Sequence, residues 1–307
     1  MKVTVLTGGV GGAKLVLGLI RLLPPAEVTA IVNTGDDFVH LSLPVSPDID
    51  TLLYTLSGRS NAEQGWGRAG ETWSFMATLR ELGGPDWFNL GDGDLALHVT
   101  RLAAFAAGGT LSAVTARIAR AWGLASPILP MSDDPVATLV DTDAGRLSFQ
   151  DYFVRLRCAP ALRAVVFEGA EAARPAPGVI DAIAGADVFL IAPSNPWLSV
   201  DPLLAVQGIR AALAGAKAPV VAVSPLVGGQ AVKGPTAKLM AELGLPLTHA
   251  SIAAHYDGLI DGLLIDTPDD AAGVDVAVAR TGTLMLSLED RVRVAQAAVD
   301  FARALAT

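Results

Sequence analysis

Residues 3–20 read VTVLTGGVGGAKLVLGLI, an apolar run followed by glycines and then by apolar residues with helical spacing. The first run, Val3–Leu6, is typical of a buried strand, and Gly8–Gly12 predicts a turn. A helix is expected over Ala13–Leu23, ending at a proline pair because proline cannot donate the backbone hydrogen bond of a helix interior. A second apolar run, Val28–Val32, follows. Strand, glycine-rich turn, helix and strand in this order predict a parallel α/β sheet.

The remaining segments extend this pattern. Asp187–Ala192 and Pro219–Ser224 predict two more buried strands, and Leu288–Leu305 predicts a final helix that begins at a near capping box. We therefore predict one α/β domain over residues 1–307: a Rossmann-like, doubly wound, mostly parallel sheet. A mainly helical insertion, residues 47–135, is expected over its carboxyl edge as part of the substrate cleft. Four helices are predicted in the insertion, at Ile49–Leu56, Glu71–Leu82, Asp94–Ala107 and Leu111–Trp122, the last with Thr110 as its N-cap. A β-hairpin is predicted directly after it, with strands at Val136–Asp141 and Arg146–Phe149.

Composition narrows the class of protein. Hydrophobic residues make up 51% of the chain, and 31 acidic against 22 basic residues give a formal net charge of −9. A nucleic-acid-binding protein normally carries a basic face, and a membrane-surface protein a polybasic one, so neither partner is expected. The chain opens directly on a predicted strand, and it has no apolar run of about 18 residues, the length that a membrane-spanning helix needs. Its single cysteine, Cys158, excludes a disulfide within the chain. We expect a cytoplasmic protein without a secretory leader.

The glycine-rich turn is a candidate anion site. Glycines allow backbone N–H groups to approach an anion closely, the following helix N-terminus adds partial positive charge, and Lys14 adds a full one. The pattern matches neither a Walker A loop nor Gly-x-Gly-x-x-Gly. A tight turn without a ligand remains an alternative, but the position and density of glycines favour a phosphate or pyrophosphate site.

Four carboxylates follow the second predicted strand. Asp36 and Asp37 come directly after it, and Asp48 and Asp50 fall in the first turn of a helix if Pro47 opens one. Mg²⁺ typically binds one or two carboxylates together with substrate phosphate oxygens. The carboxylates therefore predict a Mg²⁺ site beside the glycine turn, although helix capping also explains Asp48.

Further candidate groups are less specific. Asp94, His98 and Arg101 share one helical face, which an ion-paired surface explains about as well as a site does. The loops at 193–196 and 224–235 also follow predicted strands and suit an anion or nucleotide. The chain has no Gly-x-Ser-x-Gly elbow, and its cysteine lacks an activating environment. These features favour a reaction on a phosphate-bearing nucleotide with a divalent cation and no covalent enzyme intermediate.

Eight motifs, in the same order and spread from residue 8 to residue 235, resemble the 2-phospho-L-lactate transferases of coenzyme F-420 biosynthesis. The resemblance covers nearly the whole chain, its last 70 residues more loosely. It implies transfer of a phosphorylated three-carbon acid from its guanosine diphosphate ester to the ribityl hydroxyl of the deazaflavin Fo, with release of GMP and a need for Mg²⁺. The motifs are Gly8–Lys14, Asn33–Asp37, Ser46–Thr51, Leu90–Asp92, Met131–Val136, Phe149–Tyr152, Ser194–Pro196 and Ser224–Pro235.

The resemblance also implies residue roles and a homodimer. Asp50 would be the catalytic residue and contact the Fo hydroxyl or the metal, and Asn89 would face the deazaflavin. Asp36, Asp37 and Asp48 would be the metal ligands. The family often has a basic residue at the position of Asn89, so 2-phospholactate, phosphoenolpyruvate and 3-phosphoglycerate all stay open as the transferred acid. The nucleotide diphosphate would contact Gly9, Gly11, Gly12, Lys14, Asn33, Ser194 and Asn195.

Two other classes of protein are weighed. Gluconeogenesis-factor-like regulators share the glycine-rich opening and bind nucleotide sugars without turnover, but they lack a segment like Ser46–Thr51. A Rossmann oxidoreductase requires a cleaner Gly-x-Gly-x-x-Gly and a single ribose-binding acid. The transferase is favoured over both.

Overall fold

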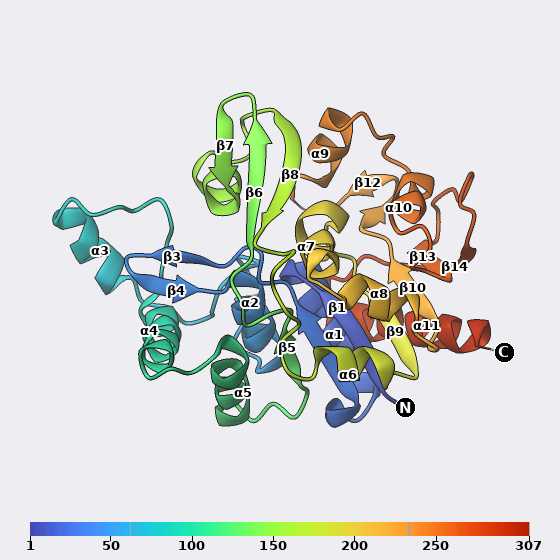
Figure 1. Cartoon of the computed structure of the whole chain (residues 1–307), viewed down its shortest axis with the longest axis horizontal. Helices are drawn as coiled ribbons and strands as arrows, with labels where there is room; N and C mark the ends of the chain where they lie inside the picture. The colour runs from blue at the N-terminus through green and yellow to red at the C-terminus, as the bar shows by residue number, and fades with distance from the viewer. Residues whose placement is uncertain (62, 233, 307) are drawn as a thin grey trace.

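A seven-stranded parallel sheet forms the centre of the computed structural model, which describes residues 1–61, 63–232 and 234–306 (Figure 1). Strand order reverses between β1 and its neighbour β9, since the chain first builds the sheet toward β5 and then toward β14. Such a reversal is the place where open α/β sheets bind ligands. In spatial order the strands are β5 (Ile128–Pro130), β2 (Val28–Val32), β1 (Val3–Thr7), β9 (Val188–Ile191), β10 (Val220–Val223), β13 (Gly262–Asp266) and β14 (Ala277–Thr281).

The sheet is covered on both faces, as a doubly wound fold requires. Alternate residues of a strand point to opposite faces, so Val3 and Val5 pack in one apolar cluster while Leu6 packs in the other. The first cluster includes residues of α1 (Gly9–Leu22) and α11 (Leu288–Leu305), and the second includes residues of α6 (Val179–Ala184) and α8 (Ile209–Ala214). The predicted fold class is confirmed.

Several predicted elements match the structure, and one is wrong. The last helix spans Leu288–Leu305 as predicted, with a complete capping box between Ser287 and Asp290. The predicted turn over Gly8–Gly12 is wrong, because α1 already begins at Gly9. Gly9 has φ +66°, a backbone conformation that glycine adopts without a steric penalty. The glycines therefore form the first turn of α1, where N–H groups lack intrahelical partners.

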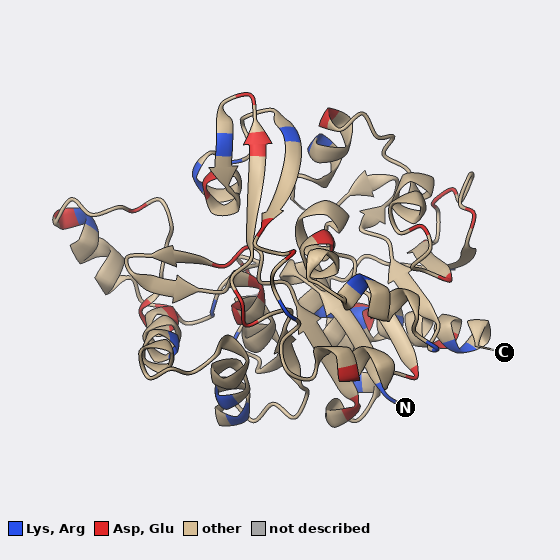
Figure 2. Cartoon of the chain, in the orientation of Figure 1, with Lys and Arg blue, Asp and Glu red and all other residues tan. Residues whose placement is uncertain are grey.

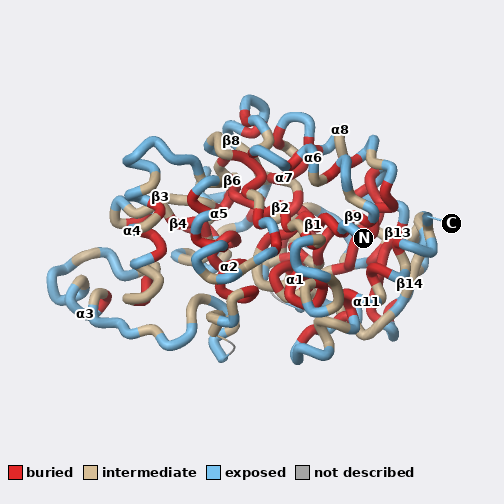
Figure 3. Tube along the Cα trace, turned by 90° about the horizontal axis from the view of Figure 1, so that it is seen from below, coloured by how far each residue is buried: buried red, intermediate tan, exposed pale blue. Residues whose placement is uncertain are grey.

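Some elements of residues 47–135 belong to the parallel sheet and its covering layers, and others lie beside the sheet. α2 (Pro47–Leu56) packs beside α1, α5 (Leu111–Ala121) packs beside β5, and β5 itself pairs with β2, so these elements belong to the sheet and its layers. By contrast, α3 (Ser74–Glu81) and α4 (Asp92–Ala106) lie to the side of the sheet, together with the hairpin of β3 (Phe38–His40) and β4 (Leu43–Val45) (Figure 1). Figure 3 shows that the surroundings of α3 are largely exposed, whereas the central strands are buried.

Two antiparallel units stand at the carboxyl edge. The predicted hairpin forms β6 (Ala137–Thr142) and β7 (Gly145–Ser148), and β8 (Leu162–Glu168) pairs with it to give a three-stranded sheet. After β10, the glycine-rich loop folds into a short hairpin of β11 (Leu226–Val227) and β12 (Gln230–Ala231), followed by the helices α9 (Thr236–Glu242) and α10 (His249–His255). Lys233 of this loop lies outside the described residues. The loop after β9 contains a single π-helical turn, Pro196–Val200, and α7 (Asp201–Ala205).

Basic residues are scattered over the ribbon in the view of Figure 2 and form no continuous stripe there. Within the described ranges, none of the helices combines the length and the apolar character that crossing a membrane would demand.

Candidate functional site

A cavity of about 770 Å³ opens at the carboxyl edge of the parallel sheet. Its wall is built from the segments that follow β1, β2, β9, β10 and β14, joined by the start of α2 and by residues 65–67 and 87–89. The segments after β1 and β9 meet directly: Gly8 N–H donates to Ser194 Oγ (3.3 Å), and this hydroxyl donates to the Gly8 carbonyl (2.7 Å). The cavity therefore sits at the switch point of the strand order, where ligands of such sheets bind.

The structure brings most of the candidate residues to this cavity. Three lie outside its lining: Gly12, Asn33 and Asp37. Gly12 packs so tightly on Thr7 that a side chain would overlap the Thr7 hydroxyl. Asp37 borders a different cavity and accepts a hydrogen bond from Ser46 Oγ (2.6 Å). The candidates that line the main cavity are Gly9, Gly11, Lys14, Asp36, Asp48, Asp50, Asn89, Ser194 and Asn195.

Asp48 links α2 to the N-terminus of α1. Its Oδ1 accepts the Gly9 N–H at 2.7 Å, and its Oδ2 accepts from Asn33 Nδ2 at 3.0 Å. The carboxylate therefore caps α1, not the helix in which it lies, because α1 presents free N–H groups and a positive dipole end to it. Asn33 thus contacts a carboxylate in this structure. Lys14, one turn into α1, donates to the Met285 carbonyl at 2.7 Å and so joins α1 to the segment after β14.

Asp36 and Asp48 are acidic groups that lack a compensating cation among the described residues. Burial, with a smaller contribution from the charge of Asp50, raises the pKa of Asp48 to about 6, against the opposing hydrogen bonds from Asn33 and Gly9. Burial also raises the pKa of Asp36 well above its usual range, with the Asp48 charge adding to the effect. Asp36 Oδ1 is buried and has no hydrogen-bond partner in the described part of the chain. Over those same residues, no group of three or more His, Cys, Asp or Glu side chains is arranged to hold a metal ion.

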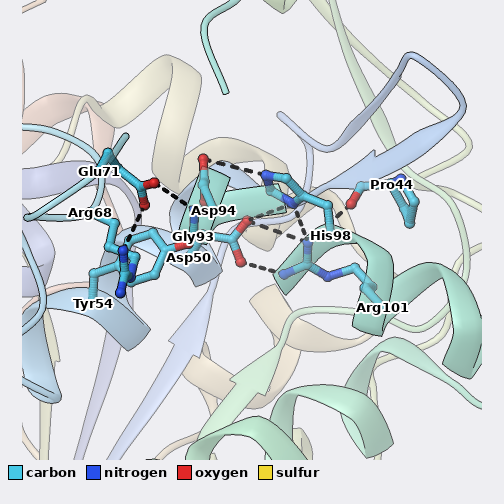
Figure 4. A network of polar contacts seen from close by, with 9 residues as sticks. All are labelled: Pro44, Asp50, Tyr54, Arg68, Glu71, Gly93, Asp94, His98 and Arg101. Atoms are coloured by element: carbon cyan, nitrogen blue, oxygen red, sulfur yellow. Dashed lines mark hydrogen bonds and ion pairs between the residues drawn. The ribbon is translucent and has the colours of Figure 1, made fainter. Parts of the chain in front are cut away.

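Asp50, in contrast, faces a cation (Figure 4). The Arg101 guanidinium of α4 contacts both of its oxygens: Nη2 pairs with Oδ1, and Nη1 lies 3.4 Å from Oδ2. Burial raises the pKa of Asp50, and the guanidinium opposes that effect. His98 Nδ1 lies 3.8 Å from Asp50 Oδ2. The predicted helical face of Asp94, His98 and Arg101 is therefore directed into the protein, where His98 and Arg101 are each 1% exposed.

The same network continues toward the rim of the cavity. Tyr54 donates its hydroxyl proton to Asp94 Oδ1, and His98 Nε2 lies 3.5 Å from Asp94 Oδ2. Beyond them, Glu71 accepts from Gly93 N–H (2.6 Å) and pairs with Arg68 (3.1 Å) (Figure 4). A side chain at Gly93 would overlap the Arg68 guanidinium and make a tight contact with Glu71, so Arg68 occupies the space over this glycine.

The wall around Asn89 is aromatic. Trp66, Trp87 and Phe88 line the cavity, and Trp87 and Phe88 pack against Phe38 of β3 with ring centroids 6.2 Å and 4.8 Å apart. Asn89 itself accepts from Arg80 Nη2 at 3.0 Å. Aromatic faces with a polar group beside them suit a planar ring system that carries hydrogen-bonding groups.

Sequence reasoning missed a second buried relay. Ser224, which lines the cavity at the end of β10, lies 2.9 Å from His249 Nδ1, and His249 Nε2 lies 2.9 Å from Asp269 Oδ2. Because an ionised carboxylate only accepts, Nε2 carries a proton and donates to Asp269; in the neutral ring, Nδ1 then accepts from the Ser224 hydroxyl. Leu226 N–H donates to the same hydroxyl (3.2 Å), so the relay anchors the β11–β12 hairpin to the cavity wall. No spacing signal could have found it, since the three residues come from separate elements.

The arrangement is a cavity at the switch point of an α/β sheet, lined by buried acidic groups. Comparison with known proteins assigns the family. The sequence model described as 2-phospho-L-lactate transferase CofD matches residues 3–295. The chain belongs to the CofD family. Relatives named phosphoenolpyruvate transferase include one from Streptomyces griseus, 47% identical over 285 residues (91% of this chain and 90% of the relative). Another, from Streptomyces avermitilis, is 48% identical over 306 residues (97% and 96%).

Membership of the CofD family confirms the resemblance found in the motifs and shows that the chain is a transferase enzyme. Among solved structures, a member of the UPF0052 family from Bacillus halodurans is similar with a TM-score of 0.63, covering 97% of this chain and 100% of that chain. Its sequence is only 16% identical, so the similarity concerns the fold alone.

Proposed function

We propose that this transferase moves a phosphorylated three-carbon acid from its guanosine diphosphate ester to the ribityl hydroxyl of Fo, releasing GMP and forming a phosphodiester in coenzyme F-420 biosynthesis. The observation that carries the proposal is that one cavity brings together four features. These are the N-terminus of α1, the carboxylates of Asp36 and Asp48, the carboxylate of Asp50, and an aromatic wall. The relatives named phosphoenolpyruvate transferase favour phosphoenolpyruvate as the acid, ahead of 2-phospholactate and 3-phosphoglycerate.

The donor side of the cavity is the switch point. The first turn of α1 offers backbone N–H groups and the positive end of the helix dipole to a diphosphate, and Ser194 and Asn195 extend this polar surface after β9. Gly11 allows the two segments to approach closely, because a Cβ there would lie 2.7 Å from the Pro193 carbonyl oxygen. Charge that develops on the departing GMP phosphate is stabilised by these oriented groups.

The acceptor side is the wall of Asp50 and Asn89. The deazaflavin ring would lie against Trp66, Trp87 and Phe88, and the ribityl chain would reach Asp50. The Asp50 carboxylate accepts a hydrogen bond from the attacking hydroxyl and directs its oxygen toward the phosphorus atom. Phosphoryl-type transfer depends mainly on such positioning and on charge stabilisation, so no covalent enzyme intermediate is needed.

The residues present fit a Mg²⁺ ion. Asp36 Oδ1 is a buried oxygen without a partner among the described residues, and the neighbouring Asp48 shares its uncompensated charge. Two carboxylates plus substrate phosphate oxygens are an ordinary ligand set for this ion. Asp36 and Asp48 would hold it, and it would offset the negative charge of the diphosphate when bound. Asp37 is a weaker candidate, since it borders another cavity and contacts Ser46.

The test is an incubation of purified protein with Fo, Mg²⁺ and each of the three guanosine diphosphate esters, with GMP and the phosphodiester quantified by chromatography. Formation of both products, lost in EDTA and restored by Mg²⁺, is expected with at least the phosphoenolpyruvate ester. An otherwise identical reaction without Fo controls for hydrolysis of the ester. Absence of GMP release with all three donors would defeat the proposal.

A cytoplasmic homodimer is also proposed. Large apolar side chains at the surface include Leu82 (80% exposed), Val39 (72%) and Leu286 (72%), and burying such groups is a common driving force for self-association. Light scattering in solution should give twice the mass of the chain, 31.6 kDa. A monomeric mass at micromolar concentration would reject the dimer without affecting the proposed reaction.

A further inference from the structure

The residue behind Asp50 is the starting point. Arg101 lies outside the cavity lining, whereas Asp50 and His98 belong to it. Arg101 is nevertheless one of the largest fully buried side chains, at 1% exposed. It therefore acts on a ligand only through the residues that it contacts.

Arg101 makes three kinds of contact from α4. Its guanidinium contacts both oxygens of Asp50, donates to the Pro44 carbonyl of β4 (3.1 Å) and lies 3.2 Å from His98 Nδ1. Nη2 pairs with Asp50 Oδ1, and the two N–H groups of Nη1 are shared among Asp50 Oδ2, the Pro44 carbonyl and His98 Nδ1. Nε is buried and has no hydrogen-bond partner among the described residues. The contacts restrict the orientation of the Asp50 carboxylate from a residue that lies outside the cavity lining.

The same guanidinium determines the state of His98. A guanidinium only donates, so His98 Nδ1 accepts from Arg101 and carries no proton. The ring proton is then on Nε2, on the side of Asp94. His98 Nε2 is buried and has no well-aligned hydrogen-bond partner among the described residues, although His98 lines the cavity.

We infer that Arg101 is a positioning residue for the transfer reaction: it holds the Asp50 carboxylate in one orientation at the cavity wall and fixes His98 with its proton on Nε2. This inference rests on the proposed function, in which Asp50 directs the attacking hydroxyl. A misplacement of about 1 Å in such a group can lower the rate about 100-fold.

The decisive variant is Arg101→Lys, which keeps the charge but cannot bridge both Asp50 oxygens, Pro44 and His98 together. We expect kcat to fall about ten- to 100-fold while KM for the nucleotide ester stays within about twofold, because the switch point that binds the nucleotide is unchanged. The matched control is Arg117→Lys, an exposed arginine that donates to the Thr100 carbonyl of α4 (3.4 Å) and should keep the wild-type kcat. Circular dichroism and urea unfolding confirm that both variants are folded.

A second measurement does not depend on activity. The chain has only four histidines, so ¹⁵N NMR of labelled protein, assigned with His98→Gln, reports the tautomer of His98 directly. We expect a proton on Nε2 and none on Nδ1 in the wild type, and a changed pattern in Arg101→Lys. A proton on Nδ1 in the wild type would overturn the inference, even if Arg101→Lys fails to fold.

The kinetic outcomes separate the inference from the proposed function. An inactive wild type rejects the proposed function, while the histidine spectrum still decides the geometry. If the wild type is active and the Arg101→Lys variant has an unchanged kcat, the positioning role is rejected and the proposed function stays intact. The same holds if the defect of the variant lies in KM.

Discussion

Replacing Asp48 by asparagine should stabilise the ligand-free protein at neutral pH. Burial raises the pKa of this carboxyl from 3.8 to about 6, so the folded state bears the cost of keeping it ionised at pH 7. One pKa unit corresponds to about 1.4 kcal/mol, which gives about 3 kcal/mol of destabilisation. The amide of the variant would keep an oxygen for the Gly9 N–H but lose the bond from Asn33, which costs about 1 kcal/mol.

The net expectation is a gain of about 2 kcal/mol in the free energy of unfolding, or about 3 °C in Tm for a chain of this size. The sign depends on pH. A carboxyl whose pKa is raised by folding destabilises the folded state most at pH values above its folded pKa, here about 6. This destabilisation declines as the pH falls toward the unfolded value of 3.8. At a pH of about 4.5 about 1 kcal/mol of penalty remains, so the variant and the wild type should be nearly equal there.

The assay is urea unfolding of both proteins at pH 7 and at about pH 4.5 in EDTA, without nucleotide. Asp141→Asn is the control, because Arg146 holds the pKa of that exposed carboxyl below its usual range and the substitution should not stabilise. The stabilised Asp48→Asn variant should also lose transferase activity, because the proposed function assigns this carboxylate to the metal site. A variant less stable than the wild type at pH 7 would refute the view that Asp48 is an uncompensated buried charge.

Three further substitutions test the packing that builds the site. Gly11→Ala should raise KM for the nucleotide ester several-fold in steady-state kinetics. The new Cβ would lie 2.7 Å from the Pro193 carbonyl oxygen and so separate the segments after β1 and β9. An unchanged KM would contradict this prediction. Gly18→Ala should lower stability by about 1–3 kcal/mol, since its Cβ would overlap the Arg291 carbonyl where α1 packs on α11, and thermal unfolding measures the loss. Ser287→Ala removes the N-cap of α11 and should cost about 1 kcal/mol in urea unfolding with kcat unchanged.

The sheet was predictable from local patterns because its signals are short-range. Apolar runs of about four or five residues mark strands, and a capping box marks the start of the last helix, so each signal needs only neighbouring residues. The glycine-rich segment departs from its local pattern because a distant residue acts on it. A glycine run predicts a turn locally, but the first turn of α1 tolerates glycines there because Asp48 of another helix caps it.

The amino-acid sequence alone determined the α/β class, the position of the glycine-rich segment at a strand end, and the family. Tertiary structure alone decided the partners of the four carboxylates. Asp48 meets Gly9 and Asn33, Asp50 meets Arg101 from α4, 51 positions further along the chain, and Asp36 keeps an oxygen without a partner among the described residues. Such pairings depend on how α2 and α4 pack beside the sheet, and packing geometry leaves no periodic trace along the chain.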